Sequence, residues 1–149
     1  MNELKYEVKG SRDLILKLGN ISDKSAIEVR KAINEGALRV RSSAISAIKK
    51  RSFGKKYMRY GKVMYRSIPG QAPNKMDGKL EANILVSTGK YDLGKTYYAE
   101  VRANTPYAEA LEYGTSKMAA RPFMGPAVKK NEAKIEELVK KAIAKGLLR

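Results

Sequence analysis

Two stretches of the chain repeat apolar residues with the period of an α-helix. In the first, from about Asp23 to Arg51, the apolar residues are mostly small or β-branched and recur every three or four positions: Ala26, Val29, Ile33, Ala37, Val40, Ala44 and Ile48. Such a narrow stripe predicts one long helix that packs closely against a sheet or another helix, with Ser22 as a candidate N-cap. The second stretch, from about Phe123 to Lys145, predicts a C-terminal helix.

The apolar face of this C-terminal helix consists of Met124, Val128, Ile135, Leu138, Val139 and Ala142. Pro126 falls within the first turn, where backbone amides lack partners inside the helix, so it does not break the helix. The residues on the opposite face of the first helix, Arg30, Lys31, Arg41 and Lys49, are interpreted as solvated surface.

Alternating apolar and polar residues predict strands elsewhere. Residues 3–9 are expected to form an opening strand, and residues 83–88 and 96–103 a hairpin around a turn at 89–94. Residues 13–19 are interpreted as a short helical run ending at Gly19. Candidates for the buried side of the hairpin are Ile84, Val86, Tyr98 and Val101. We therefore expect one α+β domain over residues 1–149, with a small, mostly antiparallel sheet packed by one long helix and a C-terminal helix.

Residues 52–76, here called the arm, fit neither pattern. Gly54, Gly61 and Gly70 argue against a continuous element, whereas the aromatic residues between them are too apolar for a solvated linker. The arm is therefore predicted to be a long loop or an irregular hairpin. Loops of this length in compact domains are usually functional or disordered.

The formal net charge of +16 is concentrated around the arm, because Gly36 to Met76 contains eleven Lys or Arg and no Asp or Glu. Such a block attracts a polyanion or an acidic protein surface. The basic residues singled out are Lys49, Lys50, Arg51, Lys55, Lys56, Arg59, Lys62 and Arg66. The first three also complement the C-terminus of the long helix. Aromatic residues between these cations could stack on bases or supply contact area to a neighbouring subunit, and both can hold for an arm that lines a DNA channel.

Composition leaves little room for catalysis. The chain has no cysteine and no histidine, which removes thiol nucleophiles, imidazole bases and the commonest zinc ligands. Two carboxylate pairs, Asp77 with Glu81 and Glu109 with Glu112, are expected on exposed helical turns. No catalytic residue, metal site or cofactor is predicted. The lack of a long apolar run or a leader predicts neither a membrane span nor a signal peptide, and hence a cytosol-like site of synthesis.

Residues 106–127 carry the most specific signals. Pro106 to Glu112 predicts about two helical turns, and Gly114 is suited to a left-handed cap that ends them. A loop from Thr115 to Ala120 then leads to Arg121-Pro122-Phe123, where the proline holds Arg121 extended and prepares the start of the last helix.

These residues resemble the minor tail-component proteins of long-tailed bacteriophages, which lie at the head-proximal end of the tail. The matching pieces are Tyr107-Ala108, Leu111-Glu112-Tyr113-Gly114-Thr115-Ser116-Lys117, Ala120-Arg121-Pro122-Phe123 and Pro126-Ala127. A weaker upstream match comprises Pro69-Gly70-Gln71-Ala72-Pro73, Gly78-Lys79-Leu80 and Ile84.

The resemblance implies a structural, non-enzymatic virion protein that completes the tail or joins it to the head, made in the bacterial host cytoplasm. It implies a homo-oligomeric ring, sixfold by analogy, in the neck region, which contacts head-tail connector and tail-tube or tail-terminator proteins and through which genomic DNA passes. Subunit-interface or fold-organising roles are expected for Tyr107, Tyr113, Gly114, Thr115, Arg121, Pro122 and Phe123. The alternative is a stand-alone basic nucleic-acid-binding protein.

Overall fold

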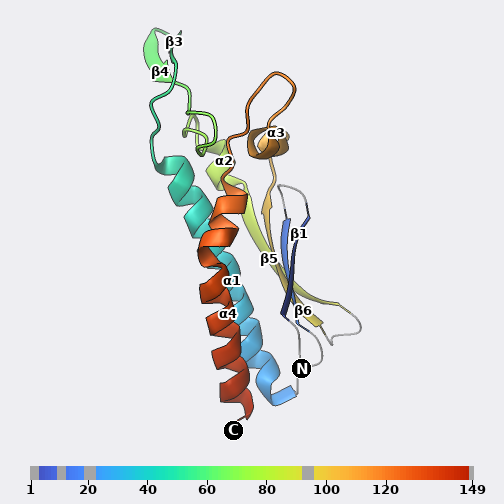
Figure 1. Cartoon of the computed structure of the whole chain (residues 1–149). Coiled ribbons are helices and arrows are strands. Elements are labelled where there is room, and N and C mark those ends of the chain that lie inside the picture. Colours follow the sequence, from blue (N-terminus) through green and yellow to red (C-terminus); the bar gives the residue numbers. More distant parts are fainter. Residues whose placement is uncertain (1–3, 10–12, 19–22, 92–95, 148–149) are drawn as a thin grey trace.

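The chain forms a four-stranded antiparallel sheet, two long helices and a small separate hairpin (Figure 1). The computed structural model describes residues 4–9, 13–18, 23–91 and 96–147. In chain order the elements are β1 (Leu4–Lys9), β2 (Asp13–Leu18), α1 (Asp23–Lys49), β3 (Lys56–Arg59), β4 (Lys62–Tyr65), α2 (Lys79–Ala82), β5 (Ile84–Tyr91), β6 (Thr96–Ala103), α3 (Ala108–Tyr113) and α4 (Met124–Leu147). This arrangement confirms the α+β class, the opening strand and both long helices.

The sheet has the order β1-β2-β6-β5, and every neighbouring pair is antiparallel. The prediction of a helix at residues 13–19 was wrong, because Asp13–Leu18 forms strand β2. An apolar run this short fits either element by its periodicity. What decides is pairing on both edges, since Leu14 lies opposite Val8 of β1 and Val101 of β6.

The turn expected at 89–94 begins later than predicted, because β5 continues to Tyr91. Residues 92–95 lie outside the described residues, as does the candidate N-cap Ser22.

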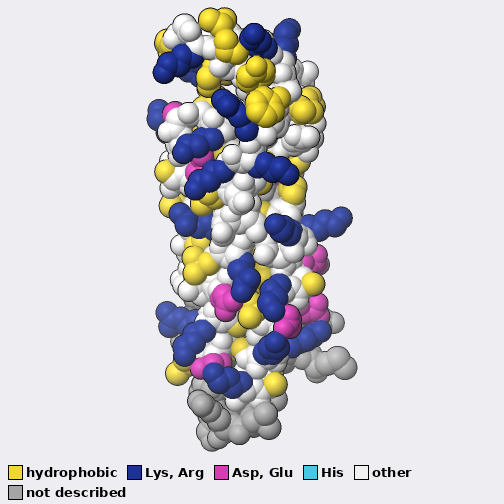
Figure 2. Space-filling view, turned by 90° about the vertical axis from the view of Figure 1, so that its left-hand side faces the viewer, with side chains coloured by type: hydrophobic (Ala, Val, Ile, Leu, Met, Phe, Trp, Pro, Cys, Tyr) yellow, Lys and Arg dark blue, Asp and Glu magenta, His cyan; other side chains and the backbone are white. Residues whose placement is uncertain are grey.

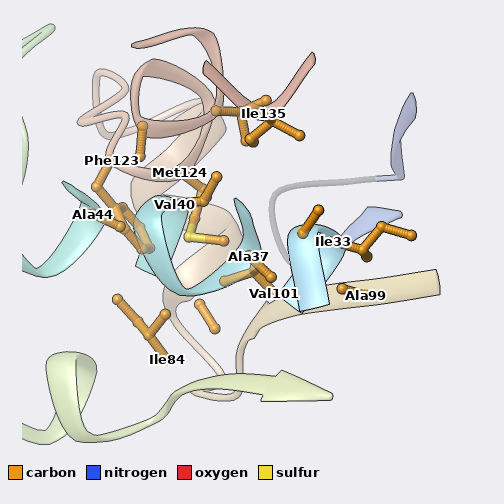
Figure 3. Packing of buried hydrophobic residues seen from close by; sticks show 14 of the residues in the cluster. Ile33, Ala37, Val40, Ala44, Ile84, Ala99, Val101, Phe123, Met124 and Ile135 are labelled. Atoms are coloured by element: carbon orange, nitrogen blue, oxygen red, sulfur yellow. The ribbon is translucent and has the colours of Figure 1, made fainter. Parts of the chain in front are cut away.

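The core lies around α1, which contacts both α4 and the inner face of the sheet (Figure 3). All seven predicted stripe residues of α1 are buried. The two helices run antiparallel, since Glu28 meets Lys145 at 2.8 Å and the Asn131 amide donates to Ser43 Oγ at 2.8 Å. Between these points the helices approach closely: a Cβ at Gly36 would lie 3.0 Å from Ile135 Cγ1.

Strand β6 presents alternate residues to the core, with Ala99, Val101 and Ala103 fully buried. Tyr97 packs against the same cluster, so Tyr98 belongs to the other face and its predicted place on the buried side was wrong. On that face the Tyr98 ring covers Gly89 of β5, where an added Cβ would come within 2.5 Å of the tyrosine hydroxyl. The other hairpin candidates, Ile84, Val86 and Val101, contact the core as expected.

The arm contains a hairpin, β3 and β4, that projects beyond the C-terminal end of α1 (Figure 1). Of the two predicted forms, a long loop or an irregular hairpin, the structure has the hairpin. Its neighbours at this end of the molecule are α2 and α3. We call this whole region, residues 50–82 and 104–122, the hairpin end. The two long helices and the four-stranded sheet form the body.

Candidate functional site at the hairpin end

The base of the arm is held by hydrogen bonds between its two ends. The Asn74 side chain accepts from Ser52 N at 2.8 Å and donates to Ser52 O at 2.7 Å and Tyr65 O at 2.9 Å. The Ser52 hydroxyl accepts from Ile68 N at 2.8 Å. Because the partners are backbone groups, these bonds fix where the arm leaves the body.

The tip of the hairpin is a two-residue turn, Tyr60-Gly61, between the paired residues Arg59 and Lys62. Both turn residues have positive φ, 49° and 71°, as a type I′ hairpin turn requires. Glycine adopts this conformation without strain, whereas tyrosine does so rarely. The Tyr60 side chain is 89% exposed and stands at the end of the arm.

Three arginines of this region lie over aromatic rings of the same segment. Arg51 lies over Phe53, Arg59 over Tyr60 and Arg66 over Tyr57, with 5.3 to 5.7 Å between each guanidinium carbon and its ring centroid. At these distances the ring faces attract the cations. The rings therefore orient the guanidinium groups while leaving them accessible.

The eight basic residues singled out in the sequence all lie at the C-terminal end of α1 or on the arm, and all are exposed: Lys49, Lys50, Arg51, Lys55, Lys56, Arg59, Lys62 and Arg66. Figure 2 shows Lys and Arg among exposed hydrophobic side chains at this end, while most of the acidic side chains visible in that view lie nearer the other end. Among the described residues, none of the eight forms a salt bridge with Asp or Glu. One end of the molecule is thus strongly cationic.

A buried carboxylate connects α3 to the start of α4. Glu112, 7% exposed, accepts hydrogen bonds from the backbone amides of Phe123 at 2.8 Å, Met124 at 3.0 Å and Gly125 at 2.7 Å. These are among the first amides of α4, which have no partners within the helix. A negative charge is also favoured at a helix N-terminus.

The expected exposure of the two carboxylate pairs was therefore wrong for one member of each. Glu112 is enclosed as the cap of α4. Glu81 is buried in α2, and its Oε1 lacks a hydrogen-bond partner within the described part of the chain. A sequence signal for the cap existed, since no Ser, Thr, Asp or Asn stands directly before α4 to satisfy its amides.

Gly114 ends α3 with φ 78° and ψ −177°, a conformation open essentially to glycine alone. Positive φ was expected, but the extended ψ differs from the left-handed cap that was predicted. A Cβ there would lie 2.7 Å from the Met118 carbonyl oxygen. Thr115 and Met118 exchange backbone hydrogen bonds at 2.7 and 3.2 Å, which closes the loop tightly against the glycine.

Arg121 links this loop to α3 and to the arm. Its backbone amide donates to Leu111 O at 2.6 Å, and its guanidinium donates to Ala119 O at 3.1 Å and, more weakly, to Ser67 O at 3.4 Å. Next to it Pro122 is half-buried and Phe123 is fully buried in the core. In contrast, Thr115, Tyr107 and Tyr113 are exposed. The segment thus faces the core with some residues and solvent with others.

A cavity of about 580 Å³ lies between the end of α1, the hairpin, α2 and α3. Its apolar lining includes Ile48, Met64, Pro73, Leu80 and Leu111. Charged lining residues are Arg59, Lys62, Asp77 and Glu81. Neither a cluster of His, Cys, Asp and Glu suited to a metal ion nor a helix long and apolar enough to cross a membrane occurs among the residues placed by the structure.

Comparison with protein families gives a match to the HK97-gp10-like family, described as "Bacteriophage HK97-gp10, putative tail-component", over residues 12–114. This range includes the arm, α2, the β5–β6 pair and α3. Residues 115–127, which carry part of the resemblance noted in the sequence, lie beyond it. A search of curated proteins and a search of solved structures found no match. Because the match covers more than half of the 149 residues, the chain belongs to the HK97-gp10-like family of bacteriophage tail components.

Proposed function

We propose that this protein is a structural component that completes the head-proximal end of a long-tailed phage tail, or joins it to the head, as a homo-oligomeric ring around the DNA path. The family supports a structural role in the tail. The observation that carries the finer role is the gathering of eight exposed cations at one end of the subunit. In this role the protein binds its neighbours through complementary surfaces and catalyses no reaction. Residues 1–149 act as a single domain.

The ring arrangement would place the arm either along the DNA channel or against an acidic neighbour such as a connector, tail-tube or tail-terminator protein. A DNA channel must attract phosphates without holding them, since tight binding would obstruct passage. Exposed cations meet this requirement because their attraction is screened over about 8 Å in physiological salt. The arginines held over Phe53, Tyr57 and Tyr60 keep such contacts spread along the arm.

The test is a variant in which Lys55, Lys56, Arg59 and Lys62 are all replaced by serine. We expect joining of heads to tails to fall, while each exposed substitution changes the free energy of unfolding by no more than about 0.5 kcal/mol. A matched control replaces Arg30, Lys129, Lys130 and Lys140, exposed cations of the body, by serine. Normal joining by the arm variant, with the four positions on the outer wall of the particle, would overturn the proposal.

Electron microscopy of the purified protein, alone and bound to tails, addresses the ring itself. The expected result is a closed ring, with sixfold symmetry by resemblance to the family, seated at the head-proximal end. A protein that stays monomeric and never associates with tails would contradict the proposed role.

A second candidate, a stand-alone nucleic-acid-binding protein, is favoured by the aromatic and cationic composition of the arm. Its signature would be DNA binding by the free monomer, with affinity that falls steeply as salt rises because each phosphate contact releases counterions. Weak DNA binding by the monomer together with ring formation would favour the tail role instead.

A further inference from the structure

The cavity at the hairpin end combines an apolar interior with an accessible mouth. Leu80 and Leu111 line it from α2 and α3, and Met64 lines it from β4. Two further lining residues are largely exposed, Tyr60 at 89% and Met76 at 54%. The volume of about 580 Å³ falls within the range of roughly 300–1,000 Å³ typical of ligand pockets. There is thus room for one or two large apolar side chains.

The lining includes two exposed cations. Arg59 and Lys62 line the cavity, are exposed and form no ion pair with an acidic group of the described chain. Of the two lining carboxylates, one is paired with a neighbouring lysine and the other is buried. Asp77 accepts from Lys79 N at 3.0 Å and lies 3.5 Å from Lys79 Nζ, while Glu81 Oε1 is shielded from solvent.

We infer that this cavity is a docking site for an acidic segment of a partner protein that carries large apolar side chains. An apolar side chain enters between Leu80 and Leu111, and flanking carboxylates meet Arg59 and Lys62. The flexible Met64 and Met76 side chains adapt to the shape of the inserted group. This inference deepens the proposed function, on which it rests, by naming the chemistry of a neighbour in the tail or neck.

Charge and polarity select this occupant over the alternatives. A second copy of the chain has 31 Lys and Arg against only 15 Asp and Glu, so it is a poor source of the carboxylates that this site would pair. Nucleic acid would satisfy Arg59 and Lys62 but would leave the apolar interior unfilled. A neutral apolar segment would fill the interior without using the cations.

The probe is a short fluorescent peptide that alternates glutamate with leucine or phenylalanine, titrated into the full chain at physiological salt and followed by anisotropy. Three comparison ligands separate the contributions: a peptide with lysine for glutamate, a peptide with serine for the apolar residues, and a single-stranded oligonucleotide. We expect the acidic apolar peptide to bind saturably and at least about tenfold more tightly than any of the three.

Two variants locate the binding. Arg59→Glu with Lys62→Glu, which reverses both charges at the mouth, should weaken the peptide about tenfold. Met76→Glu places a charge on the lining and should also weaken it. Because these side chains are exposed, folding should be intact, as circular dichroism will verify. The control, Lys129→Glu with Lys130→Glu on α4, reverses two exposed charges of the body and should leave affinity unchanged.

Equal weakening by the control would mean that net charge alone attracts the peptide, and would overturn the inference. It would also be overturned if the peptide lacking apolar residues, or the oligonucleotide, bound as tightly as the acidic apolar peptide. The peptide-binding experiment tests the docking site independently of ring assembly. Rings without peptide binding refute only the docking site, whereas peptide binding by a protein that never associates with tails refutes only the proposed role.

Discussion

The body and the hairpin end of this molecule are stabilised by different means. In the body, apolar stripes of α1 and α4 meet each other and the sheet, so burial of small and branched side chains supplies the stability (Figure 3). At the hairpin end, Phe53, Met58 and Tyr60 remain exposed, and the chain is held by polar side chains bonded to backbone groups. A segment that buries little of its apolar surface within its own fold leaves that surface exposed for contact with a partner.

The boundary between the two regions passes through residues 112–123. Glu112, in α3, caps the first turn of α4, and Phe123 next to that turn is buried in the core. The Arg121 side chain, in the same segment, donates to Ser67 O in the loop after the hairpin. We therefore expect substitutions at residues 112–123 to destabilise the body. Substitutions within the arm should leave the body stable.

Phe123→Ala is expected to have the largest effect. The side chain is fully buried, and truncation of a buried phenylalanine costs about 3–5 kcal/mol in the free energy of unfolding. Urea denaturation measures this loss. The matched control is Tyr113→Ala, in which an aromatic residue 58% exposed is removed from the same region, with an expected change of about 0.5 kcal/mol. Similar losses in both variants would erase the distinction between body and hairpin end at this boundary.

Glu112→Ala should destabilise the protein by about 1.5–3 kcal/mol, since it removes a charged acceptor from three amides of α4. Glu112→Gln retains an acceptor oxygen and should lose less. The control is Glu136→Ala, which removes only an exposed pair with Lys140 and should cost about 0.5 kcal/mol. If Glu112→Ala matched that control in urea denaturation, the carboxylate would not be the cap.

The sequence predicted the body well because burial there follows a single period along each helix. Each stripe residue from Ala26 to Ile48 is buried, as the period implies. The errors occurred where nonlocal pairing decides. The six residues of β2 form too short a pattern to distinguish a strand from a helix. Tyr97 and Tyr98 are the same residue type, so only the alternation of their neighbours on β6 determines which one faces the core.

The hairpin end was predictable in its composition but not in its geometry. Gly61 argued against a continuous element, yet a tyrosine at positive φ beside it is unusual. No local signal showed that Asn74 joins the two ends of the arm. Glu81 and Glu112 looked like solvated helix residues because each shares a short helical turn with a second carboxylate, Asp77 or Glu109. Their packing shows that both are buried. The cationic cluster alone left open whether DNA or a protein is its partner.

Asn74→Ala should loosen the arm without a comparable effect on the body. Three backbone groups lose their partner, which costs about 1–2 kcal/mol in local stability and favours opening of residues 52–76 over global unfolding. Limited proteolysis of the isolated subunit should cut first within the arm, and faster in the variant. In an assembly this segment should be protected.

The control for this experiment is Asn83→Ala, which removes one exposed side-chain bond to Lys79 O outside the arm. It should leave the cleavage rate of the arm unchanged. Cleavage of Asn74→Ala at the wild-type rate would show that the hairpin is held by something other than this side chain.

The smallest expected effect is a pH dependence of stability that the body should show and the arm should not, because only the body contains the carboxylate that titrates. Hydrogen bonds from Lys134 and Lys141 lower the pKa of Glu137, on the exposed face of α4, from 4.5 to about 2. Because the folded pKa is depressed, this contribution to stability is complete above 4.5 and is lost as pH falls toward 2. The difference in Tm between wild type and Glu137→Gln should therefore be small at neutral pH, shrink across this window and weaken in high salt. The arm, residues 52–76, contains no Asp or Glu, so its own cleavage rate, followed with an acid-active protease, should not share this transition. A Tm difference that stayed constant down to pH 2 would contradict the assignment to the ion pair, and a parallel change in the arm would show that the two regions are coupled more tightly than their separate hydrogen bonds imply.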